Sequence, residues 1–262
     1  MSTVLVTGGT GHLGRDVVRL LRAGGDRVRV LARRPGQDPG VEWIEGDLGS
    51  GAGLAEAVTG VDSVVHAATN SPIAQRGLRL GDLVHSPADV DVHGTRRLLD
   101  EARRAGVGHF LHVSIVGVQD SRLPYSRMKA SAENLVRGGD LPWSIVPATP
   151  FYWLVARMLD AMVRRRVWPL PAGLDMQPAD SADFAGYVVE CLAEGPGGLR
   201  ADFGGPEIMT LTEIARQYQE ARGVARRIVA VPLPRFALRA GGRQTCPDGR
   251  RGRTTWAEWL RR

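Results

Sequence analysis

Cysteine is scarce in this sequence of 262 residues: the chain carries two, Cys191 and Cys246. Two cysteines exclude a disulfide framework and a cysteine-rich metal site, and we predict no bound metal. Long apolar runs are also missing, since no stretch approaches the roughly 20 residues that a membrane span needs. No charged segment followed by an apolar one marks a secretory signal at the N-terminus. We therefore expect a soluble, reduced, cytoplasmic protein with no membrane partner.

Lysine is almost absent. Of the 34 basic residues, 33 are arginine and one is lysine, at position 129. The two side chains differ in shape, in hydration and in the ease with which their pKa moves. In a chain that otherwise uses arginine, a lone lysine indicates a position where a guanidinium does not serve. Lys129 is therefore a candidate functional residue.

The excess of positive charge is confined to the C-terminus. The formal net charge is +6. Residues 235–262 hold eight arginines against Asp248 and Glu258, a net of +6, while the other 234 residues hold 26 basic and 26 acidic side chains. Such a tail is typical of a solvated arm. Because the rest of the chain is neutral, we expect no nucleic-acid partner.

Apolar runs alternate with amphipathic stretches over the first 150 residues. Residues 3–7 are apolar and β-branched, a glycine-rich turn follows, residues 13–22 have helical periodicity, and residues 28–32 are apolar again. This order is one βαβ unit and implies a parallel sheet. Further strands are expected at 42–45, 63–67, 109–115 and 143–146, with helices at 54–58, 88–105 and 125–136. We predict an α/β fold, with a Rossmann-type doubly wound parallel sheet over residues 1–149.

The pattern loosens after Pro147. Helices are expected at 151–166, 182–193 and 211–222, a short strand at 202–203, and a last helix, capped by Thr254, that carries Trp256, Trp259 and Leu260. We predict that residues 150–262 form a smaller C-terminal substrate lobe with a basic tail, integrated with the first domain.

Glycines stand at positions 8, 11 and 14, directly after the first strand and at the start of the first helix. They let the backbone turn sharply and approach a phosphate, and the helix N-terminus offers N–H groups and the positive end of its dipole. This context predicts a dinucleotide site, in contrast to an ordinary tight turn. The predicted cofactor contacts here are Gly8, Thr10, Gly11, His12, Leu13 and Gly14.

The end of the second strand carries Arg33 and Arg34 where an acidic residue would bind a ribose hydroxyl. Two guanidiniums favour a 2′-phosphate. The sequence therefore predicts NADP(H) in preference to NAD(H), against the alternative of a solvated loop.

The ends of the third and fourth strands supply further predicted cofactor contacts, namely Asp47, Leu48, Ala67, Ala68 and Thr69. Asp47 can accept a hydrogen bond from the adenine, or it can instead cap the next short helix. Ala67 and Ala68 let the backbone approach the cofactor. His66 is interpreted as a packed histidine.

Ser114, Tyr125 and Lys129 form the predicted catalytic set. Ser114 ends the fifth strand, and Tyr125 and Lys129 lie four residues apart on one helix face. An ammonium near a tyrosine lowers the pKa of its hydroxyl, so Tyr125 can exchange a proton while a nicotinamide moves hydride. Ser114 would hold the substrate oxygen, and Lys129 can also bind the nicotinamide ribose.

The Gly8–Gly14 turn, Asp47, Ser114 and the Tyr125–Lys129 pair resemble the short-chain dehydrogenase/reductase superfamily, and the glycine spacing is similar to its extended and atypical branches. Segments 113–118, 124–129 and 203–207 are similar to NmrA-like, NAD(P)H-binding members. The resemblance implies the fold and the cofactor. It leaves the reaction open, because that group contains reductases, isomerases and redox sensors without turnover. Family members often carry arginine or threonine directly after the sixth strand, and the departure at 147–150 (Pro-Ala-Thr-Pro) leaves the nicotinamide-side pocket open.

The predicted substrate contacts are Thr149, Phe151, Tyr152 and Trp153, with the core of the small lobe as the alternative location. If these side chains line the pocket, the substrate is apolar or aromatic, such as a quinone or a polyketide-like ketone.

We predict an NADP(H)-dependent oxidoreductase that reduces a carbonyl or quinone of a small apolar or aromatic substrate. One alternative is an NADP(H)-binding redox sensor without turnover. Another is an isomerase or epimerase that retains its cofactor. The expected partner is a small-molecule substrate, and a protein partner or a homodimer stays open.

Overall fold

The computed structural model describes residues 1–69, 89–121, 123–234 and 242–262. Within these residues a nine-stranded parallel sheet has the order β13-β10-β6-β5-β4-β1-β2-β3, with β9 beside β6. Its strands are β1 (Thr3–Thr7), β2 (Arg27–Ala32), β3 (Glu42–Glu45), β4 (Ser63–His66), β5 (His109–Ile115), β6 (Trp143–Ala148), β9 (Gly198–Leu199), β10 (Phe203–Gly204) and β13 (Arg250–Arg251). The predicted Rossmann-type sheet is confirmed, and the strand order reverses between β1 and β4.

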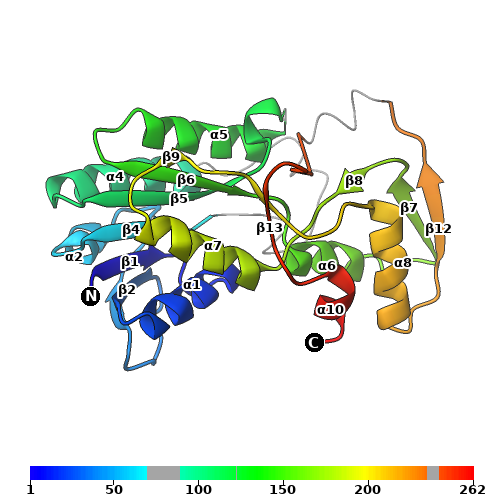
Figure 1. Cartoon of the computed structure of the whole chain (residues 1–262), viewed down its shortest axis with the longest axis horizontal. Coiled ribbons are helices and arrows are strands. Elements are labelled where there is room, and N and C mark those ends of the chain that lie inside the picture. Colours follow the sequence, from blue (N-terminus) through cyan, green and yellow to red (C-terminus); the bar gives the residue numbers. More distant parts are fainter. Residues whose placement is uncertain (70–88, 122, 235–241) are drawn as a thin grey trace.

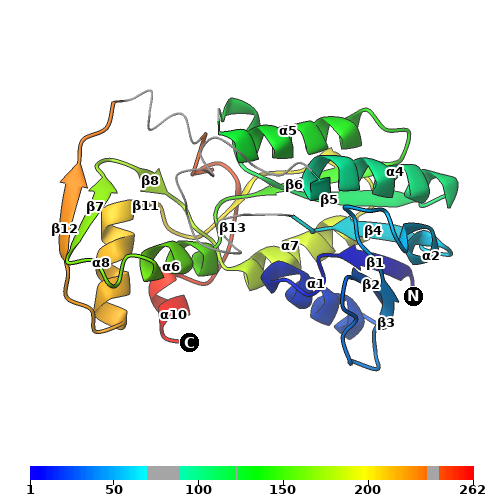
Figure 2. The same ribbon diagram turned by 180° about the vertical axis from the view of Figure 1, so that it is seen from behind.

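Helices cover both faces of the sheet (Figures 1 and 2). α1 (His12–Ala23) and α7 (Ser181–Ala193) pack together on one face. On the other face lie α2 (Leu54–Val58), α4 (Thr95–Arg104) and α5 (Pro124–Arg137), and the π-helical turn η2 (Asp89–Gly94) leads into α4. The start of the helix expected at 88–105 lies outside the described residues.

Successive side chains of a strand point to opposite faces of the sheet, which explains why helices pack on both faces. In β1, Val4 and Val6 belong to the core beneath α1 and α7, and Leu5 belongs to the core beneath α2 and α4. All three side chains are buried. A strand buried on both faces reads as a continuous apolar run, which is why residues 3–7 could be predicted directly.

A third core holds the C-terminal lobe together around Trp168, Tyr218 and Trp256. The elements around it are α6 (Tyr152–Asp160), β7 (Val167–Pro171), β8 (Asp175–Met176), β11 (Met209–Thr210), α8 (Leu211–Ala221), β12 (Arg227–Val231) and α10 (Trp256–Leu260). The helix expected at 151–166 ends early, at Asp160, and β7 follows. Trp168 and Leu170 are buried between exposed neighbours, a period-two pattern that the sequence analysis missed.

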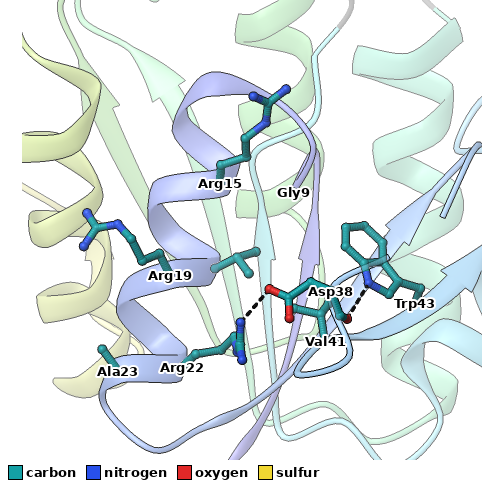
Figure 3. Close-up of a pocket in the computed structure, with 9 residues that line it drawn as sticks. Gly9, Arg15, Arg19, Arg22, Ala23, Asp38, Val41 and Trp43 are labelled. Carbon is teal, nitrogen blue, oxygen red and sulfur yellow. Dashed lines mark hydrogen bonds and ion pairs between the residues drawn. The ribbon is translucent and has the colours of Figure 1, made fainter. Parts of the chain in front are cut away.

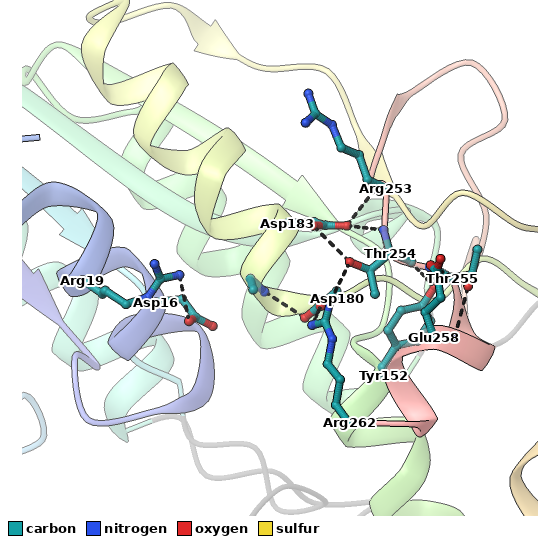
Figure 4. A network of polar contacts seen from close by, with 11 residues as sticks. Asp16, Arg19, Tyr152, Asp180, Asp183, Arg253, Thr254, Thr255, Glu258 and Arg262 are labelled. Carbon is teal, nitrogen blue, oxygen red and sulfur yellow. Dashed lines mark hydrogen bonds and ion pairs between the residues drawn. The ribbon is translucent and has the colours of Figure 1, made fainter. Parts of the chain in front are cut away.

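The predicted solvated C-terminal arm is wrong for residues 242–262. β13 joins the sheet beside β10, and α10 buries Trp256 completely. Asp183 of α7 accepts from the backbone N–H groups of Arg253 and Thr254, both at 2.7 Å (Figure 4). The side chain that caps α10 is that of Thr255, one residue after the predicted Thr254.

The arginines of this tail have local partners. Arg262 pairs with Asp180 at 2.7 Å and Arg250 pairs with Glu190 at 2.6 Å. Because Trp256 is buried and these arginines have acidic partners, composition alone does not describe residues 242–262. In the part of the chain that the structure describes, no helix combines the length and apolar character required to cross a bilayer.

Candidate functional site

The turn between β1 and α1 can be built only with glycine. Gly8 has a φ of +76°, and a Cβ there would lie 2.7 Å from the backbone nitrogen of Ala68. A Cβ on Gly14 would lie 2.1 Å from the carbonyl oxygen of Gly8. No side chain caps the N-terminus of α1. The backbone therefore forms a cradle that a Cβ would fill, at a helix end whose amides suit a pyrophosphate.

Gly14→Ala is expected to abolish binding of NADPH and to lower the melting temperature, because the new methyl group collides with the Gly8 carbonyl. Gly186→Ala is the matched control, since Gly186 lies in α7 and a Cβ there has open space. Helix propensity predicts that this control gains up to about 1 kcal/mol of stability. Calorimetry and nucleotide titration of both variants measure these effects. Normal binding by the Gly14 variant contradicts the assignment of the turn.

The end of β4 lies directly beside this turn. The backbone N–H of Ala67 donates to the carbonyl oxygen of Thr7 at 3.1 Å, and Ala68 approaches Gly8. His66 is buried and its ring nitrogens lie 2.6 Å from the Thr7 hydroxyl and 2.8 Å from the Thr95 hydroxyl. The backbone of Ala67 and Ala68 thus lies against the glycine turn at the switch point, and His66 is a packed side chain.

Arg33 and Arg34 follow β2 and are exposed. Together with Thr10 and Ala32 they line a pocket of about 570 Å³ beside the glycine turn. The predicted pair of guanidiniums is therefore next to the predicted pyrophosphate site.

A second pocket, of about 600 Å³, lies along the outer face of α1 (Figure 3). Its lining includes three arginines of α1, namely Arg15, Arg19 and Arg22. Arg22 is paired with Asp38 at 2.6 Å. Arg15 donates from Nε to the carbonyl oxygen of Thr10 at 2.9 Å, which holds a third guanidinium beside the turn. The sequence analysis did not select Arg15, whose only signal is its position directly after Gly14.

Asp47 closes a turn of its own. Its Oδ1 accepts from the backbone N–H of Gly49 at 2.6 Å and from that of Ser50 at 3.2 Å. The residue that precedes α2 is Gly53, so the alternative interpretation of Asp47 as a helix cap is wrong. Leu48 is buried. An adenine contact by Asp47 stays a prediction.

Tyr125 and Lys129 both lie on α5, which begins at Pro124, a favourable first helical residue. Lys129 is buried, and its Nζ donates to the carbonyl oxygen of Val113 at 3.2 Å. The same Nζ lies 3.6 Å from Oδ1 of Asp91, which is also buried. The Tyr125 hydroxyl lies 3.0 Å from the Thr69 hydroxyl, and Thr69 donates to Oδ1 of Asp91 at 2.7 Å. Four side chains from three segments are thus joined at the end of β4.

The hydroxyl of Ser114 makes its hydrogen bond outside this group of four side chains. Its buried hydroxyl donates to Oε1 of Glu133 at 2.5 Å. Glu133 also accepts from Gln119 at 2.8 Å and pairs with Arg137 at 3.2 Å. With its hydrogen committed to Glu133, Ser114 can accept a hydrogen bond but has none to donate. Its predicted contact with a substrate oxygen therefore requires this bond to open.

Two of the predicted substrate contacts lie in the core. Tyr152 is fully buried and donates to the carbonyl oxygen of Thr254 at 2.9 Å. Thr149 is buried and donates to the carbonyl oxygen of Gln177 at 2.6 Å. Both side chains pack in the core in this structure, and their contact with a substrate stays a prediction. Phe151 is half-buried and packs near Phe184.

Trp153 is the substrate candidate that reaches the glycine turn. Its indole stacks on the His12 ring, with centroids 4.5 Å apart. Burial and the neighbouring Arg15 lower the pKa of His12, so its imidazole is neutral at neutral pH. The stack joins the C-terminal lobe to the N-terminus of α1, where a pyrophosphate would lie. Nothing in the sequence pairs residues 12 and 153.

Comparisons with known proteins agree with this geometry. Residues 8–194 match the family model described as NAD(P)H-binding. The chain is 32% identical to sterol demethylase protein B of Methylococcus capsulatus, covering 88% of this chain and 77% of that protein. It is 30% identical to a (4-alkanoyl-5-oxo-2,5-dihydrofuran-3-yl)methyl phosphate reductase of Streptomyces griseus, covering 90% of this chain and 80% of the reductase.

A solved structure extends the comparison of folds. An NADPH-dependent quinone oxidoreductase from Escherichia coli, crystallised with NADPH, superposes with a TM-score of 0.77. The alignment covers 98% of each chain at 18% identity. At this identity the likeness concerns the fold alone.

Proposed function

The chain belongs to the NAD(P)H-binding family of short-chain dehydrogenase/reductase-like oxidoreductases, and we propose that it uses NADPH to reduce a carbonyl or quinone of a small apolar or aromatic substrate. Tyr125 is the proposed general acid. Residues 1–149 would bind the cofactor. Of residues 150–262, α7, β9, β10 and β13 complete the sheet, and the elements around the third core would contribute the lobe on the substrate side. The observation that carries the proposal is the hydrogen-bonded group of Tyr125, Thr69, Asp91 and Lys129 at the switch point of the sheet.

The residues present fit a dinucleotide. The cradle of Gly8 and Gly14 and the uncapped N-terminus of α1 would hold its pyrophosphate. A bound nicotinamide supplies the hydride. Tyr125 would donate a proton to the substrate oxygen, and Lys129, held by Val113 and Asp91, would face the phenolate that remains.

The proposed preference for NADPH depends on Arg33 and Arg34. The double variant Arg33→Ala, Arg34→Ala is expected to bind NADPH about 10² to 10⁴-fold more weakly, since two charge-assisted contacts are lost and each costs about 1.5 to 3 kcal/mol. NADH has no 2′-phosphate, and its affinity should not change. Arg27→Ala, at the opposite end of β2, is the control and should leave both affinities unchanged. An unaltered preference in the double variant removes these residues from the proposal.

The proposed substrate class follows from Trp153, a half-buried aromatic side chain stacked on His12 beside the glycine turn. The names of two relatives refer to a sterol and to a (4-alkanoyl-5-oxo-2,5-dihydrofuran-3-yl)methyl phosphate. These names support an apolar carbonyl substrate.

The test is a titration of the purified protein with NADPH and NADH, followed by measurement of NADPH consumption against a panel of quinones and aromatic ketones. We expect tighter binding of NADPH and consumption with at least one apolar acceptor. Binding without consumption across the panel favours the redox-sensor alternative. Failure to bind either nucleotide overturns the proposal.

A further inference from the structure

The hydrogen bond between Tyr125 and Thr69 has a definite direction. A threonine hydroxyl has one hydrogen, and Thr69 gives it to Asp91 at 2.7 Å. In the 3.0 Å contact between the two hydroxyls, Tyr125 is therefore the donor. A hydrogen bond donated by a phenol stabilises the neutral form, because the phenolate cannot make it. Thr69 thus favours protonated Tyr125.

The charge beside Tyr125 is also balanced. Lys129 alone would favour the phenolate, but its Nζ lies 3.6 Å from Asp91, and the two side chains are 5% and 0% exposed. Charges interact strongly in such a buried place, so the carboxylate offsets much of the field that the ammonium exerts on Tyr125. Asp91, like Thr69, therefore favours the protonated form of Tyr125.

In the part of the chain that the structure describes, the other titratable groups packed around this pair are uncharged or paired elsewhere. His66 on β4 and His112 on β5 have centroids 5.3 Å apart, and both are buried. Burial, with Lys129 nearby, lowers the pKa of His66 to about 3 and that of His112 well below its ordinary value, so both are uncharged at neutral pH. Glu133, one turn after Lys129 on α5, is engaged by Ser114, Gln119 and Arg137. Among the described residues, Lys129 and Asp91 are therefore the charged side chains that join the hydrogen-bonded group of Tyr125.

We propose that Asp91 and Thr69 hold Tyr125 as a neutral phenol, which sets the site to donate a proton and hence to work in the direction of reduction. This inference rests on the proposed function, since it assigns a direction to that reaction. Asp91 acts through Lys129 and Thr69 and is a positioning residue.

The proton balance of the proposed step is simple. The phenolic hydrogen turns from Thr69 to the substrate oxygen, the O–H bond of Tyr125 breaks, and a new O–H bond forms on the substrate. The carbonyl carbon gains the hydride of NADPH, which leaves NADP⁺ and an alcohol. The phenolate of Tyr125 would then be attracted by the ammonium of Lys129, four residues along α5, until a proton from solvent restores the phenol.

The ionisation of Tyr125 can be measured without any substrate. Phenolate absorbance in the near ultraviolet is followed against pH, and the curve of Tyr125→Phe is subtracted. The chain has four tyrosines. Burial is the main cause that raises the pKa of Tyr187 and of Tyr218 to about 12 and that of Tyr152 higher still. Tyr125 is therefore expected to titrate first, with a midpoint above neutral pH.

Asp91→Asn keeps the shape of the side chain and removes its charge, and we expect the midpoint of Tyr125 to fall by about one pH unit or more. Thr69→Val removes the acceptor without changing any charge and should lower the midpoint by a smaller amount. The control is Asp180→Asn, which removes a buried carboxylate paired with Arg262 at the start of α7, on the opposite face of the sheet. It should leave the midpoint unchanged.

An unchanged midpoint in both the Asp91 and the Thr69 variants overturns the inference, as does a wild-type Tyr125 that is already phenolate at neutral pH. If Asp91→Asn does not fold, the Thr69 variant decides. NADPH consumption by the wild-type protein tests the proposed function separately. If the reductase activity is present, its pH profile should move to lower pH in Asp91→Asn together with the spectroscopic midpoint.

Discussion

Tyr125→Phe is expected to lower NADPH-dependent turnover by a factor of roughly 10² to 10⁴, the usual contribution of a positioned general acid. The variant keeps the ring and removes the hydroxyl that contacts Thr69. The affinity for NADPH should stay within about twofold, because the glycine turn and Arg33 and Arg34 are unaltered. Steady-state kinetics with the best acceptor of the panel and nucleotide titration measure the two quantities on the same preparation.

Tyr187→Phe is the matched control for this experiment. Tyr187 lies on α7, across the sheet from α5, and its hydroxyl donates to the carbonyl oxygen of Ala201 at 3.2 Å. Its loss should leave turnover unchanged. Full activity in Tyr125→Phe would falsify the assignment of Tyr125 as the proton donor, and a parallel loss of NADPH binding would indicate a structural role instead.

The second large effect is loss of stability in weak acid. Burial lowers the pKa of His66 to about 3 and that of His109 to about 4, and it lowers that of His112 as well. An unfolded histidine takes up a proton below about pH 6.5, which these folded histidines do not, so stability falls as the pH falls from 6.5 towards their folded values. At about pH 5 each of His66 and His109 costs about 2 kcal/mol.

This loss is large against the 5 to 15 kcal/mol that typically stabilises a protein. It corresponds to a melting temperature lower by about 10 °C at pH 5 than at neutral pH. Differential scanning calorimetry across this range measures it. A melting temperature that does not change between pH 7 and pH 5 contradicts the neutral state of the buried histidines.

The variant His112→Leu tests the contribution of a single buried histidine. Both ring nitrogens of His112 are buried without a hydrogen-bond partner among the described residues. Leucine removes this unpaired polar group, so we expect higher stability at neutral pH and a weaker dependence on acid. His93→Gln, at an exposed histidine in η2, should change neither.

The tail and Asp47 show how sequence interpretation succeeds or fails. The helix with Trp256, Trp259 and Leu260 was predicted, but its packing against α8 and Tyr152 depends on contacts made by residues far apart in the chain. The composition of the tail does not record these distant contacts, and for that reason it predicted a solvated arm. Asp47, by contrast, closes a turn with its own neighbours, an interaction of short range that the sequence analysis did not consider beside the adenine contact and the helix cap.

The sequence by itself determined the βαβ order, the glycine turn and the position of Tyr125 four residues before Lys129, because periodicity and backbone requirements act over a few residues. Only the tertiary structure decided what surrounds the tyrosine. Thr69 and Asp91 lie 56 and 34 residues before Tyr125, and they meet it because η2 and α5 converge at the C-terminal end of β4, a central strand of the sheet. The same convergence turned Ser114 towards Glu133. Hydrogen-bond partners of this kind depend on packing between elements, which no local pattern records.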